Sequence, residues 1–460
     1  PLGAAGAPAY ATATTITALS QPTDNIKLNT GASSVANDLT VNSLATSNVA
    51  VGLVTIAAGK TLTIASGGLL SFTNTTWYVG SAVDQGFLTS GGAELFFYTQ
   101  GSATPTIRSI VKDNAGGPVA LVKAGANTGA LSGTNTYTGG TVVNQGTLNI
   151  NAGSLVPLAA DPTAGVRLNG GALVTFAAGA IAAGNTVVLN GSGSLYYFGD
   201  NTVAGLKLNN LGGTPFVRTF ATNSGTGLGS RGVLTIGAGG IVATSENVTT
   251  TSYVEGRVDF GASANTIDVA PINVNGVTDV DPLRAGFALQ AVVGSAGGLT
   301  KTGNGVLQLN AQSHFTGGLT VAAGGLRNGV TNAGSRLSRL TLAAGSRYDL
   351  YNLNTTWGSL AGSGDIFSSI ASPNLQVGFD GTSSTFSGRI QRFNNALNPT
   401  LTKVGGGVLT LDAAQDGDAS IGQIIVGGGT LRYAGAGKAF VGTALQTTSL
   451  VANTNGTLQL

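Results

Sequence analysis

The sequence contains no cysteine and no methionine, and its 460 residues include a single histidine. Without cysteine the chain can form neither disulfides nor cysteine–metal sites, and it has no thiol nucleophile. Charged residues make up only 9% of the chain, the net charge is +2, and lysine and arginine do not cluster. We therefore expect no nucleic-acid partner. Glycine, threonine, asparagine and serine interrupt every apolar run before about 18 residues, so we expect no membrane insertion by this segment.

Glycine is abundant instead, with 73 residues, about twice its average usage. The glycines separate short alternating runs such as VTIAAGKTLTI (54–64) and VRLNGGALVTF (166–176). Alternation with a period of two is typical of β-strands, and glycine allows the positive φ that tight corners need. The sequence therefore predicts an all-β chain of short strands joined by glycine corners.

A longer unit recurs at residues 121–148, 299–326 and 401–431. Lys123 and Lys301 each precede a Gly-Gly pair by 16 residues, and matching spacings in separated copies indicate a repeat protein. The predicted corner glycines of these units are Gly139, Gly140, Gly146, Gly317, Gly318, Gly324 and Gly429. At roughly 20 residues per coil, we predict a parallel β-helix (β-solenoid) of about 20 rungs, with insertions at its corners.

The domain organisation follows from the same pattern. Residues 1–50 are weakly patterned, and we predict an extended N-terminal lead-in or cap there, because a solenoid otherwise exposes its end coil. Residues 51–460 form the predicted solenoid. Residues 243–296 carry much of the charge and are predicted to contain an excursion from the coils.

The three long units carry a family resemblance. They read LTKTGNGVLQL with FTGGLTVAAGGL, LVKAG with LSGTNTYTGGTVVNQGTL, and LTKVGGGVLTL with IIVGGGTL. They resemble the autotransporter-associated β-strand repeat found in passenger domains of secreted bacterial surface proteins. The resemblance implies a right-handed parallel β-helix located outside the cell, on the bacterial surface or secreted.

Few residues offer chemistry. Asp412, Asp416 and Asp418 lie where the third copy is three residues longer, and clustered oxygens suit Ca²⁺. A polar turn is the simpler interpretation, so we predict no metal and no cofactor. Glu255 and Asp259 share one face of an alternating strand, and paired carboxylates can cleave polysaccharide. A solvated face with ion pairs is the simpler interpretation, so we predict no catalytic residue.

Two further kinds of residue are candidates for a functional role. His314, the single histidine, stands at a bridge position of the second copy where the first has Thr136, which indicates a corner rather than a catalytic residue. Trp77, Tyr78 and Trp357 are candidates for a surface contact, because exposed aromatic rings can stack on sugars. A surface polysaccharide is therefore one candidate partner.

For function, we expect a non-enzymatic extracellular structural protein that self-associates into a cell-surface fibre or sheath. The low net charge opposes association little, and open strand edges at the end rungs invite head-to-tail contact or strand addition. One alternative is a monomeric autotransporter passenger that acts as an adhesin or stalk. A second is a polysaccharide-degrading β-helix enzyme.

Overall fold

The computed structural model describes residues 16–18, 20–28, 32–46, 52–220, 232–278, 280–391, 399–412, 421–434 and 449–459. The chain divides into two compact units, residues 1–207 with 215–234 (unit 1) and residues 208–214 with 235–460 (unit 2). Apart from one short 3-10 helix, η1 (Pro162–Ala164), the regular structure among the described residues is β-strand. Among these residues no helix is long and apolar enough to cross a membrane.

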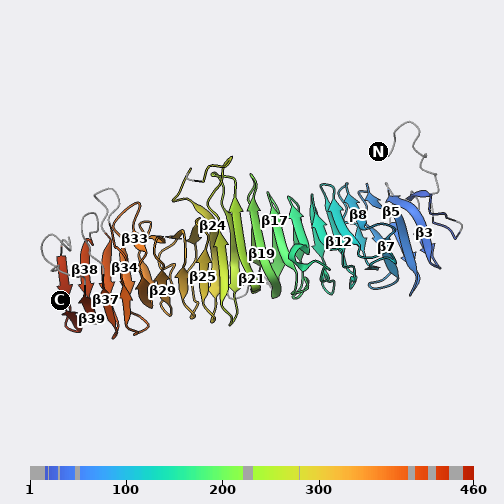
Figure 1. Ribbon diagram of the computed structural model, residues 1–460. Coiled ribbons are helices and arrows are strands. Elements are labelled where there is room, and N and C mark those ends of the chain that lie inside the picture. The colour runs from blue at the N-terminus through green and yellow to red at the C-terminus, as the bar shows by residue number, and fades with distance from the viewer. Residues whose placement is uncertain are drawn as a thin grey trace. The chain divides into compact units, whose positions relative to one another are not determined.

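Unit 1 is a stack of short parallel strands (Figure 1). Most strands pair with the one two positions later, whereas β6 to β9 pair with the one three positions later and β5 pairs with both β7 and β8. In one ladder Leu121 lies opposite Thr141, and Thr141 lies opposite Val166. The strands of unit 1 are β1 (Asn25–Leu28), β2 (Ala32–Val35), β3 (Leu39–Thr46), β4 (Gly52–Ile56), β5 (Thr61–Ser71), β6 (Trp77–Val79), β7 (Phe87–Ser90), β8 (Glu94–Thr99), β9 (Thr106–Ile107), β10 (Ile110–Val111), β11 (Ala120–Ala124), β12 (Thr128–Leu131), β13 (Thr141–Val143), β14 (Thr147–Ile150), β15 (Val166–Asn169), β16 (Ala172–Thr175), β17 (Thr186–Asn190), β18 (Ser194–Phe198) and β20 (Phe216–Phe220).

Unit 2 repeats this arrangement and adds a separate five-stranded sheet, β31-β34-β36-β38-β40. Two strands, β19 (Asn201–Asn210) and β21 (Leu234–Ser245), include residues of both units. The other strands of unit 2 are β22 (Ser252–Asp259), β23 (Asn265–Val269), β24 (Ala285–Gly294), β25 (Leu299–Thr302), β26 (Val306–Leu309), β27 (Leu319–Val321), β28 (Gly325–Asn328), β29 (Arg339–Leu342), β30 (Arg347–Asp349), β31 (Thr355–Trp357), β32 (Ser359–Gly362), β33 (Asp365–Phe367), β34 (Asn374–Val377), β35 (Ser384–Phe386), β36 (Thr400–Lys403), β37 (Val408–Leu411), β38 (Gln423–Val426), β39 (Gly429–Tyr433), β40 (Ser449–Ala452) and β41 (Gly456–Gln459).

The predicted all-β parallel solenoid is confirmed, but the predicted number of coils is too high. The structure has about 16 coils rather than about 20. Paired residues lie from 18 positions apart (Asn25 with Ser43) to 35 positions apart (Ser252 with Phe287). The prediction assumed a constant coil length, whereas insertions at the corners lengthen many coils.

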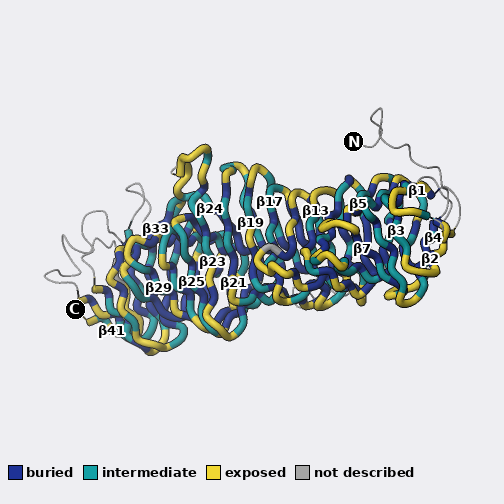
Figure 2. Tube along the Cα trace, turned by 45° about the vertical axis from the view of Figure 1, so that its right-hand side comes forward, coloured by how far each residue is buried: buried dark blue, intermediate teal, exposed yellow. Residues whose placement is uncertain are grey.

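The core follows from strand alternation. In β22 every second residue is buried, and Figure 2 shows the same alternation of buried and less buried positions along the strands. The inward side chains stack coil on coil. In unit 2 one column consists of Leu299, Leu319, Leu340 and Leu360, all buried. Burying one such side chain stabilises the fold by about 2 kcal/mol, so each coil contributes to holding its neighbours.

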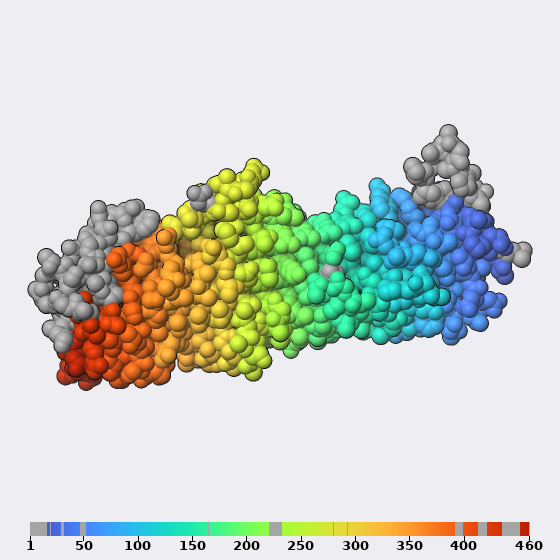
Figure 3. Space-filling model, in the orientation of Figure 1, coloured from blue at the N-terminus to red at the C-terminus, as the bar shows by residue number. Residues whose placement is uncertain are grey.

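Two predicted boundaries fall within regular structure. Strands β1 to β3 lie inside the predicted lead-in, where β1 pairs with β3 and β3 with β5 in parallel. Residues 1–15 of that lead-in lie outside the described residues. In unit 2, β22, β23 and β24 continue the coils within residues 243–296. The segment between β23 and β24 stands out from the coils (Figures 1 and 3). The division at residue 50 stays a prediction.

Candidate functional site

One lysine in each long repeat copy lies in the interior. Lys123 in β11, Lys301 in β25 and Lys403 in β36 are at most 1% exposed. Each ammonium group donates three hydrogen bonds to backbone carbonyls. Two acceptors belong to the next two residues, and the third lies about one coil further along the chain. The Nζ–O distances are 2.9, 2.9 and 3.1 Å from Lys123 to Ala124, Gly125 and Gln145; 3.0, 2.5 and 2.9 Å from Lys301 to Thr302, Gly303 and Ala323; and 2.5, 3.0 and 3.2 Å from Lys403 to Val404, Gly405 and Gly428.

These lysines therefore act as pins between successive coils. Burial disfavours the charged form and lowers the pKa of Lys123 and of Lys301 to about 8, and it also lowers the pKa of Lys403. The three carbonyl oxygens compensate each buried ammonium group, and the negative charges of Asp268 and Asp380 partly oppose the lowering of the pKa at Lys301 and Lys403. The spacing of these lysines identifies the repeat in the sequence, but we did not predict their burial. The signal for it is a lysine at the third position of LVK, LTK and LTK, where the strand pattern expects a core residue.

The predicted corner glycines lie where the chain turns or where coils approach closely. Positive φ angles occur at Gly140, Gly146, Gly318, Gly324 and Gly429. At Gly324, with φ of 69°, an added Cβ would lie 2.5 Å from Gly305 O of the preceding coil. At Gly139 and Gly317 an added Cβ would overlap the backbone of another coil, near Ala120 and Gly298 respectively.

The predicted surface contact through tryptophan is wrong. Trp77 is 1% exposed and Trp357 is 0% exposed, because both occupy inward positions of their strands. Their indole N–H groups donate to neighbouring hydroxyls: Trp77 Nε1 to Ser71 Oγ at 2.8 Å, and Trp357 Nε1 to Tyr348 Oη at 3.1 Å. These hydrogen bonds satisfy the buried N–H groups, so both rings can be fully buried. The sequence does not show these hydrogen-bond partners. Tyr78 is partly exposed, with the guanidinium carbon of Arg108 3.3 Å from the centre of its ring.

The predicted acidic residues do not come together as a site that the structure describes. Asp412 is exposed after β37, while Asp416 and Asp418 lie outside the described residues. Glu255 and Asp259 occupy outward positions of β22, as the alternation predicts. His314 is exposed in the corner between β26 and β27.

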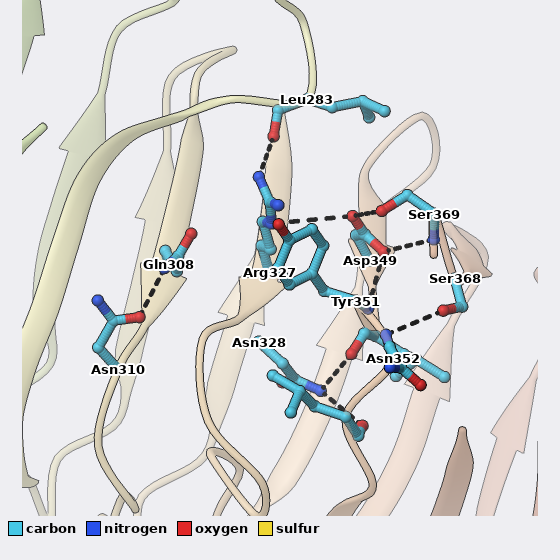
Figure 4. A network of polar contacts seen from close by, with 12 residues as sticks. Leu283, Gln308, Asn310, Arg327, Asn328, Asp349, Tyr351, Asn352, Ser368 and Ser369 are labelled. Atoms are coloured by element: carbon cyan, nitrogen blue, oxygen red, sulfur yellow. Dashed lines mark hydrogen bonds and ion pairs between the residues drawn. The ribbon is translucent and has the colours of Figure 1, made fainter. Parts of the chain in front are cut away.

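A network of polar contacts in unit 2 surrounds Arg327 and Asp349 (Figure 4). The Asp349 carboxylate accepts hydrogen bonds from the backbone N–H groups of Tyr351 and Ser369 and from the Ser369 hydroxyl. Arg327 Nε lies 4.0 Å from Asp349 Oδ2. Because its oxygens are already occupied and it is only 4% exposed, this carboxylate is poorly suited to take a proton from a substrate.

Arg327 also ties a loop to the coils. Its Nη1 donates to Leu283 O at 3.1 Å, and its guanidinium carbon lies 3.4 Å from the centre of the Tyr351 ring. Leu283 belongs to the segment that enters β24. Together with Pro282 it lines a cavity of about 260 Å³, which Arg347 and Asp349 also line. The network thus ties a loop that lines a small cavity to the coils.

The chain is similar to known proteins in two comparisons. The family described as passenger-associated-transport-repeat matches residues 121–155 and 299–327. An "Adhesin BmaC autotransporter" of Brucella suis biovar 1 (strain 1330) is 29% identical over 321 residues. That match covers 63% of this chain and 9% of the relative's length. No solved structure matches the chain.

The matched residues contain two of the three lysine pins, Lys123 and Lys301. The third copy, at residues 401–431, lies outside them. Its Lys403 nevertheless makes the same three bonds to carbonyl groups. The pin therefore marks the repeat in three dimensions where the sequence has diverged.

Proposed function

We propose that the chain is an adhesive stalk segment of a secreted or surface-displayed autotransporter passenger, because two of its repeat copies match the passenger-associated-transport-repeat family. The similarity to an adhesin over 63% of the chain carries this proposal. The matched segment is a small part of that relative, so contact with a target cell is a proposal for this segment and not a property taken over from the relative.

The construction of the coils supports a role in contact rather than catalysis. Inward positions are filled by stacked leucine, valine and isoleucine and by the pinned lysines. Outward positions on parallel strands form regular rows along each ladder, which give a stiff surface for attachment. The Asp349 carboxylate is occupied by hydrogen bonds, and Glu255 and Asp259 lie on an open strand face.

A bead assay tests the proposal. Beads coated with the purified chain should be retained on cultured animal cells several-fold above beads coated with albumin. Soluble chain should compete for the same cellular sites and release the bound beads. Retention equal to that of the albumin beads, on every cell type tried, would remove the adhesive role.

Self-association into a fibre or sheath stays a separate proposal. It is supported by the net charge of +2 on 460 residues, which leaves little repulsion between copies. Sedimentation velocity over a wide concentration range should then show species larger than the monomer. A monomer alone at all concentrations would exclude fibre formation by this segment and would leave the adhesive role intact.

A further inference from the structure

A cleft on unit 2 is distinct from the network around Arg327 and is lined by four successive coils. It has two lobes, of about 480 Å³ and about 330 Å³, which share Gln312, Arg336 and Phe379 in their walls. The larger lobe adds residues of β31 and β34, including Thr356 and Gln376. The smaller lobe adds residues from two corners, 313–314 and 335–337.

One carboxamide side chain per coil lines the larger lobe. Gln312, Asn332, Asn354 and Gln376 follow one another at intervals of 20, 22 and 22 residues. Their coils are tied together, since Asn332 N donates to Asn354 O at 2.8 Å and Asn374 N donates to Asn354 Oδ1 at 2.8 Å. The coils stack at the strand spacing of ~4.8 Å, but the amides are staggered along the strands, because Gln376 of β34 lies opposite Thr356 of β31 rather than opposite Asn354. We call this staggered row of one amide per coil the carboxamide column.

Several groups in the cleft have no hydrogen-bond partner among the described residues. Thr356 is 8% exposed and Ser313 is 3% exposed, and the hydroxyl oxygen of each is buried without a partner. The side-chain amides of Gln312 and Gln376 and the guanidinium of Arg336 also make no hydrogen bond to a described residue. A buried hydroxyl without a partner is costly, so a ligand that supplies one gains affinity there.

The lining of the cleft contains basic residues and no acidic residue. Neither lobe is lined by aspartate or glutamate, whereas both contain Arg336, and the smaller lobe also contains His314. The guanidinium carbon of Arg336 lies 4.1 Å from the centre of the Phe379 ring, which holds the planar group in place with its N–H donors free. A guanidinium placed in this way is suited to bind a carboxylate or sulfate by two parallel hydrogen bonds.

We propose that this cleft binds an acidic saccharide, whose hydroxyl groups contact the carboxamide column and Thr356 and whose anionic group contacts Arg336. Amides and hydroxyls both donate and accept, as sugar hydroxyls do, and one amide per coil allows an extended saccharide to repeat its contacts along the stack. The proposal deepens the adhesive function by naming the class of receptor, and it rests on that function for its biological meaning.

Direct binding of the purified full chain to immobilised oligosaccharides tests the proposal. Galacturonate oligomers, their neutral methyl esters and sulfated galactan oligomers provide matched carboxylated, neutral and sulfated probes. We expect binding to the carboxylated or the sulfated set and none to the esters, and the stronger of the two identifies the anion. Binding to the neutral set alone, or to none of them beyond the blank surface, would overturn the proposal and leave a cleft that holds only water.

Substitutions place the binding in the cleft. Arg336→Gln should weaken binding of the acidic oligomer about ten- to a hundredfold, because a charged pair of hydrogen bonds is lost. Thr356→Val keeps the side-chain shape, removes only the unpartnered hydroxyl and should weaken binding about tenfold without lowering thermal stability. The matched control, Arg347→Gln, removes an exposed arginine of unit 2 outside the cleft and should bind normally. Equal losses in Arg336→Gln and Arg347→Gln would show that binding is a general charge effect, contrary to the proposal.

The bead assay separates this inference from the proposed function. Retention of wild-type and Arg336→Gln beads on cells at the same level would contradict the saccharide site and leave the adhesive role standing. Acidic oligomers that bind through Arg336, combined with no bead retention on any cell, would contradict the adhesive role and leave the site standing.

Discussion

Replacing Lys123 with methionine should destabilise the coils around β11 by ~3 kcal/mol. The Lys123 ammonium group donates to the carbonyls of Ala124, Gly125 and Gln145 at 2.9, 2.9 and 3.1 Å. Methionine fills a similar volume but donates no hydrogen bond. Three buried acceptors therefore lose a partner, and at ~1 kcal/mol for each lost bond the total is ~3 kcal/mol.

One effect opposes this loss. Burial lowers the pKa of Lys123 to about 8, which shows that the interior disfavours the charge. Replacing buried charges with apolar residues of similar size is neutral or stabilising in some proteins. Here the acceptors are backbone carbonyls at fixed places in the corner, so they remain unpaired after the substitution. We therefore expect the loss of hydrogen bonds to dominate.

Hydrogen exchange measured by mass spectrometry is the appropriate assay, because coils of a repeat protein open locally. Peptides covering residues 120–150 should exchange roughly a hundredfold faster in Lys123→Met than in the wild type, since 1.4 kcal/mol corresponds to a factor of ten. Lys207→Met, at an exposed strand position, is the control and should leave exchange unchanged. Unchanged or slower exchange in Lys123→Met would refute the role of the lysine as a pin between coils.

Three further predictions concern unit 2. Burial lowers the pKa of Lys301 to about 8 from its ordinary 10.5, so between these values the folded chain has released a proton that the unfolded chain keeps. The free energy of unfolding of the wild type should therefore gain a contribution between pH 8 and pH 10.5 that is absent from Lys301→Met. Urea midpoints that fall equally in both proteins over this range would contradict the prediction. Gly324→Ala combines a φ of 69° with a Cβ 2.5 Å from Gly305 O and should cost ~3 kcal/mol. Gly345→Ala has a φ of 79° and no atom within 4 Å, so it should cost only ~1 kcal/mol, and equal costs in urea unfolding would show that the close approach is unimportant. Leu319→Ala, in the leucine column, should lower the free energy of unfolding by about 3 kcal/mol. A loss under about 1 kcal/mol would mean that the neighbouring side chains fill the space that the leucine leaves.

The strands and corners could be predicted because each depends on local chemistry. Alternation fixes which side chains of a strand such as β22 point inward, and a corner with positive φ requires glycine at positions such as Gly324. The same rule could have corrected the assignment of the tryptophans. Trp77 and Trp357 stand at inward positions, but the hydroxyls of Ser71 and Tyr348 that pair with their N–H groups become visible only when the coils are stacked.

The remaining features were missed because they are formed between coils. Lys123 appears as a charged residue in the sequence, and only the position of Gln145 O, 22 residues later, shows that its ammonium group is paired. The carboxamide column is equally hidden. Gln312 and Gln376 are 64 residues apart, and residues between them supply its middle. No local pattern links such residues, because the variable coil length removes a fixed period.

In the stacked coils, the inward face of each strand is constrained by neighbouring coils and the outward face is free to vary. An inward position repeats its contacts with the coils above and below, so Leu319 and Lys301 are constrained by neighbours on both sides. An outward side chain contacts only the other outward side chains of its row, so Gln376 can be substituted without disturbing the stack of coils. A solenoid built in this way can keep one scaffold while its outward surface changes one coil at a time. Moving the carboxamide column and Arg336 onto four coils elsewhere in unit 2 should therefore transfer binding of the acidic saccharide without changing the fold.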